Sequence, residues 1–176
     1  MLHGEVAGLR ARQDSDIPVL HAELYDDVPT RVQSDTRPWR PIPPGGPDSP
    51  YRDSGSADVA IFSVVQLDSD ELAGEALLWG IDPHNRAAHV GISLRPAFRG
   101  RGLGTDTVRL LCRYGFQLRG LHRLQLETLA SNAAMQAVAA RAGFTREGVL
   151  RRSAWAIGGF ADEVLFGLLA DEWQAG

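Results

Sequence analysis

Lysine is absent from this sequence of 176 residues, and cysteine occurs once, as Cys112. With a single thiol the chain cannot form an internal disulfide or a cluster of thiolates around a metal. The five histidines are scattered and none stands in a metal-ligand spacing such as H-E-x-x-H, so we expect no metal site. Cys112 lies on a predicted helix, either as a small buried side chain or as a nucleophile. The missing lysine also excludes a P-loop, whose glycine-rich turn ends in Gly-Lys-Ser/Thr.

Basic charge and long hydrophobic runs are lacking as well. The net charge of −4 and the isoelectric point near 5.7 argue against general binding of nucleic acid, which normally needs a basic face. No run approaches the roughly 18 apolar residues of a membrane span, and residues 1–12 lack the pattern of a signal peptide. We therefore expect a cytoplasmic protein without nucleic-acid or membrane partners. The length and the 44% hydrophobic content fit one domain, residues 1–176.

Hydrophobic periodicity predicts an α/β (α+β) protein with a mixed, mostly antiparallel sheet. A helix from Ile17 to about Asp26 follows the first strand, and a longer one runs from Leu103 to near Gly120. Because strand, helix and strand follow one another between residues 88 and 129, we expect a right-handed parallel crossover there. A short helix capped by Ser131 and Asn132 ends at Gly143. The predicted strands are residues 6–12, 59–66, 72–79, 88–94, 123–129, 144–150, 153–157 and 160–169.

The segment 28–57 breaks this regularity. It holds seven of the ten prolines and three glycines, so we expect a loop and no regular core element. A loop of this length in a compact domain is usually a lid, a binding loop or a disordered stretch. We interpret it as a substrate-side loop, and both an ordered flap and a mobile loop remain open.

The stretch from Leu94 to Thr105 is the strongest local signal, because an apolar strand gives way to a glycine-rich turn and then to a helix. A helix start leaves its first N–H groups without intrahelical partners and carries the positive end of the macrodipole, so it can bind an anion. Glycines at 100, 102 and 104 let the main chain approach a ligand closely. Arginines at 99 and 101 add charge suited to a pyrophosphate. The stretch is not a dinucleotide fingerprint, which requires glycine at position 105.

The run R-G-R-G-L-G, residues 99–104, resembles the acetyl-CoA motif Q/R-x-x-G-x-G/A of the GNAT N-acetyltransferase superfamily. Further segments are similar to its RimJ/RimL-like branch of ribosomal-protein N-terminal acetyltransferases. The resemblance covers nearly the whole chain and rests on residues 86–94, 96–104, 131–135, 142–151 and 166–173.

This resemblance implies the GNAT fold, with helices on both sheet faces and a V-shaped splay between the fourth and fifth strands, residues 88–94 and 123–129. It places acetyl-CoA as co-substrate in the splay, with its pantetheine paired along Ile92, Ser93 and Leu94, and with Asn132 near the thiol. A homodimer is compatible with the family. The pyrophosphate is assigned to main-chain amides of Arg99, Gly100, Arg101, Gly102, Leu103, Gly104 and Thr105.

Amine acylation needs a neutral amine, a polarised thioester carbonyl and a proton for the leaving thiolate. The backbone amide of Leu94 can donate to the developing oxyanion. His89 stands where the branch usually has glutamate, and histidine can take up a proton directly or through water. Its other reading is a residue that merely fills a strand position. Glu75 and Glu127 on neighbouring predicted strands are alternative bases.

The family positions for a general acid depart from the pattern. Tyrosine is replaced by Ala139 and serine by Met135, and neither side chain can donate a proton; Ser131 is a further candidate. Two functions follow. The first is an N-acetyltransferase that moves an acetyl group from acetyl-CoA to a primary amine of a protein N-terminus, polyamine, amino acid or antibiotic, by direct attack through a tetrahedral intermediate. The second is a non-catalytic GNAT-fold module that binds acyl-CoA.

Acidic residues gather in and around the first predicted helix, and two interpretations stay open. They can attract a cationic amine, or they can form a solvated acidic helix face. The residues concerned are Asp14, Asp16, Glu23, Asp26 and Asp27.

Overall fold

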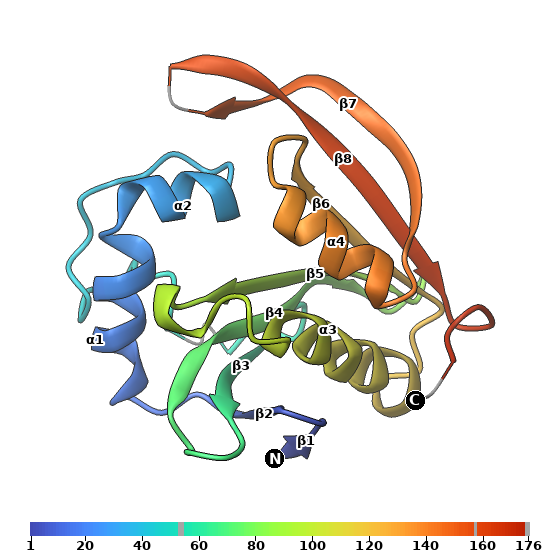
Figure 1. Ribbon diagram of the computed structural model, residues 1–176, viewed down its shortest axis with the longest axis horizontal. Coiled ribbons are helices and arrows are strands. Elements are labelled where there is room, and N and C mark those ends of the chain that lie inside the picture. Colours follow the sequence, from blue (N-terminus) through green and yellow to red (C-terminus); the bar gives the residue numbers. More distant parts are fainter. Residues whose placement is uncertain (53–54, 157, 175–176) are drawn as a thin grey trace.

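In the described residues, 1–52, 55–156 and 158–174 of the computed structural model, eight strands form one sheet with helices on both its faces (Figure 1). The strands are β1 Leu2–His3, β2 Ala7–Ala11, β3 Ala60–Gln66, β4 Leu72–Asp82, β5 Ala87–Leu94, β6 Arg123–Leu129, β7 Thr145–Ala156 and β8 Gly159–Leu169. The helices are α1 Asp16–Leu20, α2 Val28–Ser34, α3 Leu103–Arg113 and α4 Ala133–Arg141, with π-helical turns η1 His21–Tyr25 and η3 Tyr114–Leu118 and the 3₁₀ turn η2 Pro96–Phe98.

The strand order is β1-β2-β3-β4-β5-β6-β8-β7, and every neighbouring pair is antiparallel except β5 and β6. This order confirms the predicted sheet and the parallel crossover. β5 and β6 pair over only three residues each, 87–89 with 123–125, and beyond that point they diverge. The predicted splay is therefore present. It lies between the fifth and sixth strands because the two-residue β1 is too short to be seen in the sequence pattern.

One feature of the C-terminal strands differs from the prediction. The separate strands predicted at 144–150 and 153–157 form one strand, β7, whose pairing with β8 shifts between Leu150 and Ala154. Ile157 lies outside the described residues. In Figure 1 the β7–β8 hairpin extends past the rest of the sheet, and α2 lies below its far end in this view.

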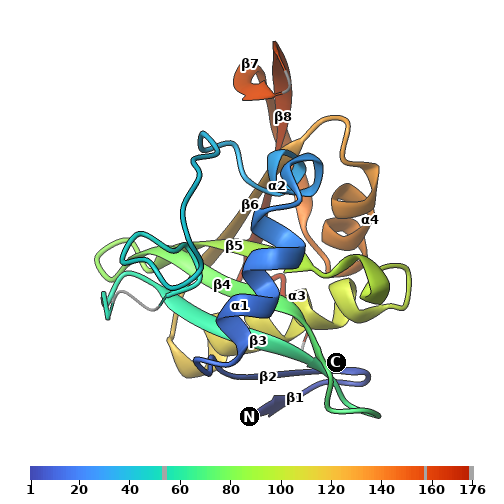
Figure 2. The same ribbon diagram turned by 90° about the vertical axis from the view of Figure 1, so that its left-hand side faces the viewer.

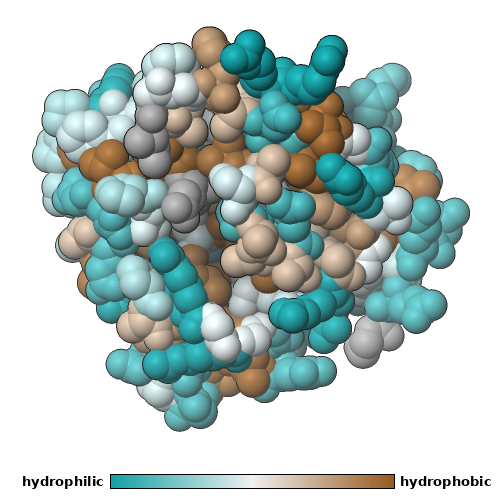
Figure 3. Space-filling view, turned by 45° about the horizontal axis from the view of Figure 1, so that its top comes forward, coloured by the Kyte–Doolittle hydropathy of each residue, from teal (hydrophilic) through white to brown (hydrophobic). Residues whose placement is uncertain are grey.

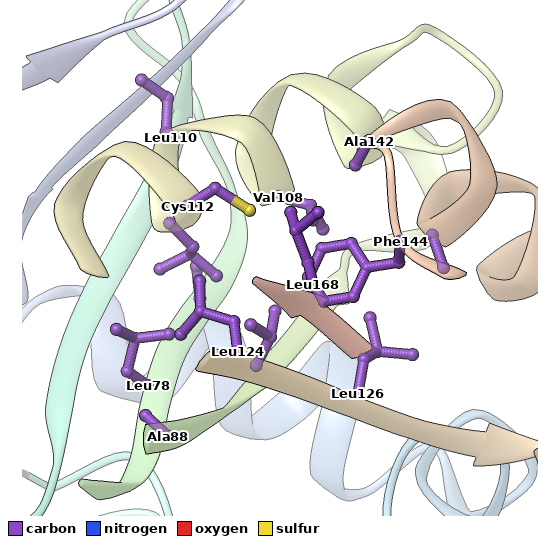
Figure 4. Packing of buried hydrophobic residues seen from close by; sticks show 14 of the residues in the cluster. Leu78, Ala88, Val108, Leu110, Cys112, Leu124, Leu126, Ala142, Phe144 and Leu168 are labelled. Atoms are coloured by element: carbon purple, nitrogen blue, oxygen red, sulfur yellow. The ribbon is translucent and has the colours of Figure 1, made fainter. Parts of the chain in front are cut away.

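The main core lies between the sheet and the pair α3 and α4. Alternate β5 residues, Ala88 and Val90, face this side, as Leu124 and Leu126 do from β6. Figure 4 shows Cys112 directed from α3 into this cluster. Burial raises the pKa of its thiol to about 12, which leaves no thiolate near neutral pH and supports the reading of a small buried side chain.

The opposite face carries α1, η1, α2 and part of the proline-rich segment (Figure 2). Leu20, Leu24 and Tyr25 form a second buried cluster with Tyr51. The predicted helix at 17–26 is thus present, as α1 followed by the π-helical turn η1. Ser15 precedes it without making a side-chain cap.

The prediction that residue 28 begins a loop is wrong for the first seven residues, which form α2. Asp27 caps this helix by accepting a hydrogen bond from the Thr30 amide, and Pro29 stands in the first turn, where proline needs no N–H partner. The segment after α2 is attached to the second cluster, because the Tyr25 hydroxyl donates to the Arg40 carbonyl at 2.8 Å. Residues 53 and 54 lie outside the described residues.

Asp16 joins α1 to the sheet. It is 4% exposed, and its carboxylate accepts hydrogen bonds from Arg10 at 2.7 and 2.8 Å, from the Gln13 amide at 2.9 Å and from the Ser63 hydroxyl at 2.7 Å. Burial alone would raise the pKa of this carboxyl, but the hydrogen bonds from Arg10, Gln13 and Ser63 outweigh burial and lower the pKa to about 2.

We expect Asp16 to make stability depend on pH in acid. The pKa of Asp16 is lowered in the folded protein. Its carboxylate therefore contributes to the free energy of unfolding above the ordinary pKa value of 3.8, and this contribution is lost as the pH falls through about 2. The difference in unfolding free energy between the wild type and Asp16→Asn should shrink by about 2 kcal/mol from pH 5 to pH 2. Urea unfolding at several pH values measures this difference. Exposed Asp14→Asn is the control for loss of one carboxylate, and a constant difference for Asp16→Asn contradicts the assignment.

Hydrophobic side chains on the surface occur in several places. In the space-filling view they stand in small groups among hydrophilic residues (Figure 3). Trp155 and Phe160, at the far end of the β7–β8 hairpin, are 59% and 62% exposed and contact each other edge to face. Within the ranges that the structure describes, no helix has the length and apolar character needed to cross a membrane.

Candidate functional site

Two cavities meet at the splay between β5 and β6. The first, of about 500 Å³, lies over the sheet face that carries α1 and α2, and the second, of about 360 Å³, lies at the glycine turn before α3. Four residues line both cavities: Ile92, Ser93, Asn132 and Met135. A molecule in one cavity can therefore contact a molecule in the other through the gap that the diverging strands leave.

The second cavity has the geometry of an anion site. Gly100 and Gly102 adopt φ angles of 74° and 82°, a left-handed conformation that favours glycine, and a Cβ atom added at either position would meet no atom within 4 Å. The first N–H groups of α3 have no intrahelical partners there, and they carry the positive end of the helix dipole. The glycines thus leave open space for an anion directly in front of these donors.

The β5 backbone offers further donors. The Ser93 carbonyl points toward β4, where a Cβ at Gly74 would lie 2.2 Å from it, and the Arg95 amide bonds to the Ala73 carbonyl on the same side. Because successive peptide groups of a strand point to opposite sides, the N–H groups of Ile92 and Leu94 point into the splay. An extended ligand with amide groups can pair with them as an added strand.

Most of the predicted cofactor residues line the second cavity, and two do not. Leu103 is buried in the main core, and the Arg101 guanidinium lies 5.6 Å from the centre of the Phe98 ring. Arg101 therefore does not supply its side chain to the cavity, although both residues keep main-chain amides in the turn. The predicted residues that line it are Ile92, Ser93, Leu94, Arg99, Gly100, Gly102, Gly104, Thr105 and Asn132.

Asn132 combines the two roles that the sequence left open. Its side chain caps α4 by accepting a hydrogen bond from the Met135 amide at 3.1 Å, and it stands where the two cavities meet. Met135 lies beside it, whereas Ala139 is fully buried in the main core. Neither cavity is lined by Ser131 among the described residues.

The first cavity brings together all three predicted candidate bases: His89, Glu75 and Glu127. The His89 ring stacks on Trp79, with ring centres 4.1 Å apart and planes 21° apart, and its Nδ1 atom lies 3.3 Å from Oε1 of Glu127. The nearby His89 is the main cause of a lowered pKa of the Glu127 carboxyl, and the hydrogen bond from Gln125 adds to it. A carboxylate facing an imidazole is an arrangement that serves proton transfer.

Glu75 has a different environment. It stands directly opposite Ser93 in the β4–β5 pairing, and its carboxylate accepts a hydrogen bond from Arg12 at 3.1 Å. Burial raises the pKa of this carboxyl, while the charge of Arg12 opposes the rise. Arg12 also donates to the carbonyls of Tyr51 and Phe62, so the pair joins the proline-rich segment to the sheet. This pairing favours a structural role for Glu75.

None of the five acidic residues near the first helix lines either cavity. Asp16 is buried against Arg10, Glu23 pairs with Arg95, and Asp27 caps α2, so these three carboxylates are engaged within the protein. Two other carboxylates, Asp35 and Glu163, line the first cavity and were not predicted. Asp35 forms ion pairs with Arg31 and Arg37, whereas Glu163 accepts a hydrogen bond from the Ser153 hydroxyl.

Metal chemistry has no visible site in the described ranges, where no three histidine, cysteine, aspartate or glutamate side chains gather in a way that could hold a metal ion.

Comparisons with known proteins identify the family that this chain matches. Residues 8–145 match the family described as acetyltransferase (GNAT) domain. The putative ribosomal N-acetyltransferase YdaF of Bacillus subtilis is 33% identical over 118 residues, which are 67% of this chain and 64% of that protein.

Solved structures of low sequence identity share the fold. A spermidine N-acetyltransferase from Vibrio cholerae in complex with CoA and spermine matches with a TM-score of 0.77 and 20% identity over 94% of this chain and 96% of that one. RimL, a ribosomal L7/L12 alpha-N-protein acetyltransferase in complex with coenzyme A, matches with a TM-score of 0.75 and 22% identity over 95% and 96%.

Proposed function

This chain belongs to the GNAT acetyltransferase family, and from that membership we propose that it transfers an acetyl group from acetyl-CoA to a primary amine. The observation that carries the proposal is the meeting of the two cavities at Ile92, Ser93, Asn132 and Met135. A donor in the second cavity and an acceptor in the first come into contact only at these residues. We also propose one catalytic domain over residues 1–176, in which 28–57 forms the substrate side.

The second cavity fits the donor. Acetyl-CoA supplies an activated acetyl thioester at the end of a long arm that carries a pyrophosphate. The main-chain amides of residues 99–105 bind the pyrophosphate, since Gly100 and Gly102 leave open space in front of the α3 N-terminus. The N–H group of Ile92 pairs with a pantetheine amide, which satisfies a backbone group that the splay leaves without a strand partner, and the N–H group of Leu94 stays available for the thioester oxygen.

The chain supplies a base and an oxyanion donor for the transfer. His89 takes one proton from the bound ammonium group through intervening water, which leaves a neutral amine. The amine nitrogen then attacks the thioester carbonyl, and the Leu94 amide binds the oxygen that becomes negative. A carbon–nitrogen bond forms, the carbon–sulfur bond breaks, and the thiolate leaves. With Met135 and Ala139 at the family acid positions and Ser131 outside both cavities, the thiolate takes its proton from water.

The acceptor binds as a cation. Of the four carboxylates among the described residues lining the first cavity, Asp35 and Glu75 are paired with arginine, whereas Glu127 and Glu163 make no ion pair with arginine there. These two attract an ammonium group to the cavity. Both a protein N-terminus and a polyamine meet this requirement, in line with the substrates in the names of YdaF and the Vibrio cholerae enzyme.

We expect turnover with at least one class of cationic amine. The test measures CoA release with ribosomal N-terminal peptides, polyamines, amino acids and aminoglycosides, with an N-acetylated version of each amine as control. Rates should exceed thioester hydrolysis by at least about 100-fold for the preferred class, which corresponds to one effective catalytic interaction. Tight binding of acetyl-CoA with no turnover over this panel favours the alternative, a non-catalytic module that binds acyl-CoA.

A further inference from the structure

We propose that Glu127 is a positioning residue that holds His89 with its Nδ1 atom protonated and its Nε2 atom free to accept a proton. The inference rests on the proposed function and deepens it, because two residues first considered as competing bases become one unit with separate roles. Three observations carry it: the surroundings of the imidazole, the anchoring of the carboxylate, and the charges around both.

Three residues define the surroundings of the imidazole: Trp79, Gly80 and Glu127. Trp79 covers one ring face at 4.1 Å between ring centres. The Cδ2 edge passes over Gly80, where an added Cβ would lie only 3.3 Å from Cδ2 and 4.0 Å from Nε2, so a glycine there leaves the Nε2 side uncrowded. Among the described residues the buried Nδ1 atom makes no hydrogen bond; the carboxylate of Glu127, 3.3 Å away, is the acceptor that the structure places beside it.

The carboxylate is itself held in place along β6. The Gln125 side-chain amide donates to Oε1 of Glu127 at 2.6 Å, and Arg123 donates to the side-chain oxygen of Gln125 at 3.1 Å. Arg123 in turn pairs with Glu147 on β7. These hydrogen bonds therefore fix the oxygen atom of Glu127 that faces the imidazole. Because Gln125 is neutral, the charge of Glu127 is paired with no arginine among the described residues.

Other charged groups face this pair from the elements around the first cavity. They are Glu75 on β4, paired with Arg12, and Glu163 on β8, bonded to Ser153, together with Arg31, Asp35, Arg37 and Arg52 from α2 and the segment after it. Asp35 is paired with two of these arginines. The structure thus places Glu127, and no other carboxylate, within ion-pair distance of His89 among the described residues.

This arrangement determines which nitrogen can act. A neutral imidazole has one N–H and one lone pair, and the hydrogen bond at one nitrogen decides where the proton resides. A carboxylate at Nδ1 selects the Nδ1–H form, which leaves the Nε2 lone pair for the amine proton. Once Nε2 has taken that proton, the negative charge of Glu127 stabilises the imidazolium, as the carboxylate does in a catalytic triad.

The test uses two variants that remove different properties of the Glu127 side chain. Glu127→Gln removes the charge but keeps an oxygen that can accept from Nδ1–H, whereas Glu127→Leu removes both. In ¹⁵N-histidine-labelled protein, with the His89 signal assigned by its loss in His89→Ala, we expect the Nδ1–H form in the wild type and in Glu127→Gln. Glu127→Leu should shift the population to the Nε2–H form. Glu163→Gln, a carboxylate change in the same cavity, is the control and should leave the tautomer unchanged.

Kinetics give the second readout. Glu127→Leu should lower kcat by about 10- to 100-fold with little change in KM for acetyl-CoA, an effect typical of partners that orient an imidazole, and Glu127→Gln should lose less. In the His89→Ala background, Glu127→Leu should lower kcat by less than about threefold, because residues that act as a unit are not additive.

Two results overturn the proposal. One is an unchanged tautomer in Glu127→Leu; the other is an equal loss of kcat in the presence and absence of His89, which makes Glu127 an independent base. The tautomer is read without turnover, so a protein that acetylates no amine but shows the switch refutes the proposed function and leaves the pairing of His89 with Glu127 intact.

Discussion

Gly102→Glu is expected to weaken acetyl-CoA binding by at least about 100-fold, or about 2.7 kcal/mol. Gly102 is the N-cap of α3 with φ 82°, and a side chain there costs about 1–2 kcal/mol of backbone strain. A carboxylate at this position also meets the pyrophosphate. At about 5 Å and an effective dielectric constant near 20, each pair of like charges costs about 3 kcal/mol. Isothermal titration calorimetry with acetyl-CoA measures the loss.

Two controls separate charge from strain. Gly120→Glu introduces the same residue at a glycine with φ 63° and equally open surroundings, away from both cavities, so it should leave binding unchanged. Gly102→Ala carries the strain without the charge and should show an intermediate loss. If Gly102→Glu binds acetyl-CoA as the wild type does, the phosphate assignment of the turn is wrong.

The glycine turn could be predicted from the sequence because its physics is local. A strand end, left-handed glycines and a helix start lie within a dozen residues, and each has its own composition signal. The parallel crossover between β5 and β6 also followed from short-range patterns, since alternation marks both strands and a helix lies between them. The splay between these strands was implied by the family resemblance. The partner of each side chain across the sheet could not be predicted from such patterns.

The stacking of Trp79 on His89 shows why that partner was missed. The two residues are paired across the β4–β5 hairpin, but the register shifts between Trp79 and Asp82, so counting outward from the turn gives another partner. Glu163 enters the cavity only because β8 lies beside β6, a pairing of segments about 35 residues apart. Nothing in the local pattern indicates such a neighbour.

The prediction of a loop throughout the proline-rich segment was wrong at its start because it rested on composition. Seven prolines suggested a loop throughout, yet Pro29 stands in the one part of a helix where proline is well tolerated, and Asp27 supplies the cap. The environment of the acidic residues could not be predicted for a different reason, because their charge pattern in the sequence is the same whether they are solvated or paired. Only the fold brings Arg10 to Asp16 and Arg95 to Glu23.

His89→Ala is expected to lower kcat for amine acetylation by about 10²- to 10⁴-fold, the usual contribution of a positioned general base. Binding of acetyl-CoA should be retained, since His89 lines the first cavity and not the second. The decline of kcat/KM on the acid side of the pH–rate profile should also change shape, because the protonation of this group no longer limits the rate. Steady-state kinetics between pH 5 and pH 9 measure both effects.

His89→Glu provides the decisive comparison, since glutamate is the residue that the RimJ/RimL-like branch usually has at this position. A carboxylate there can accept the same proton, but it also faces Glu127, and two like charges at close range repel. We therefore expect His89→Glu alone to recover little activity and His89→Glu combined with Glu127→Gln to recover at least about tenfold over His89→Ala. Exposed His84→Ala is the control for loss of a histidine. An unchanged pH–rate profile in His89→Ala removes His89 as the base, and with it the reason for a carboxylate at position 127 to point toward the ring.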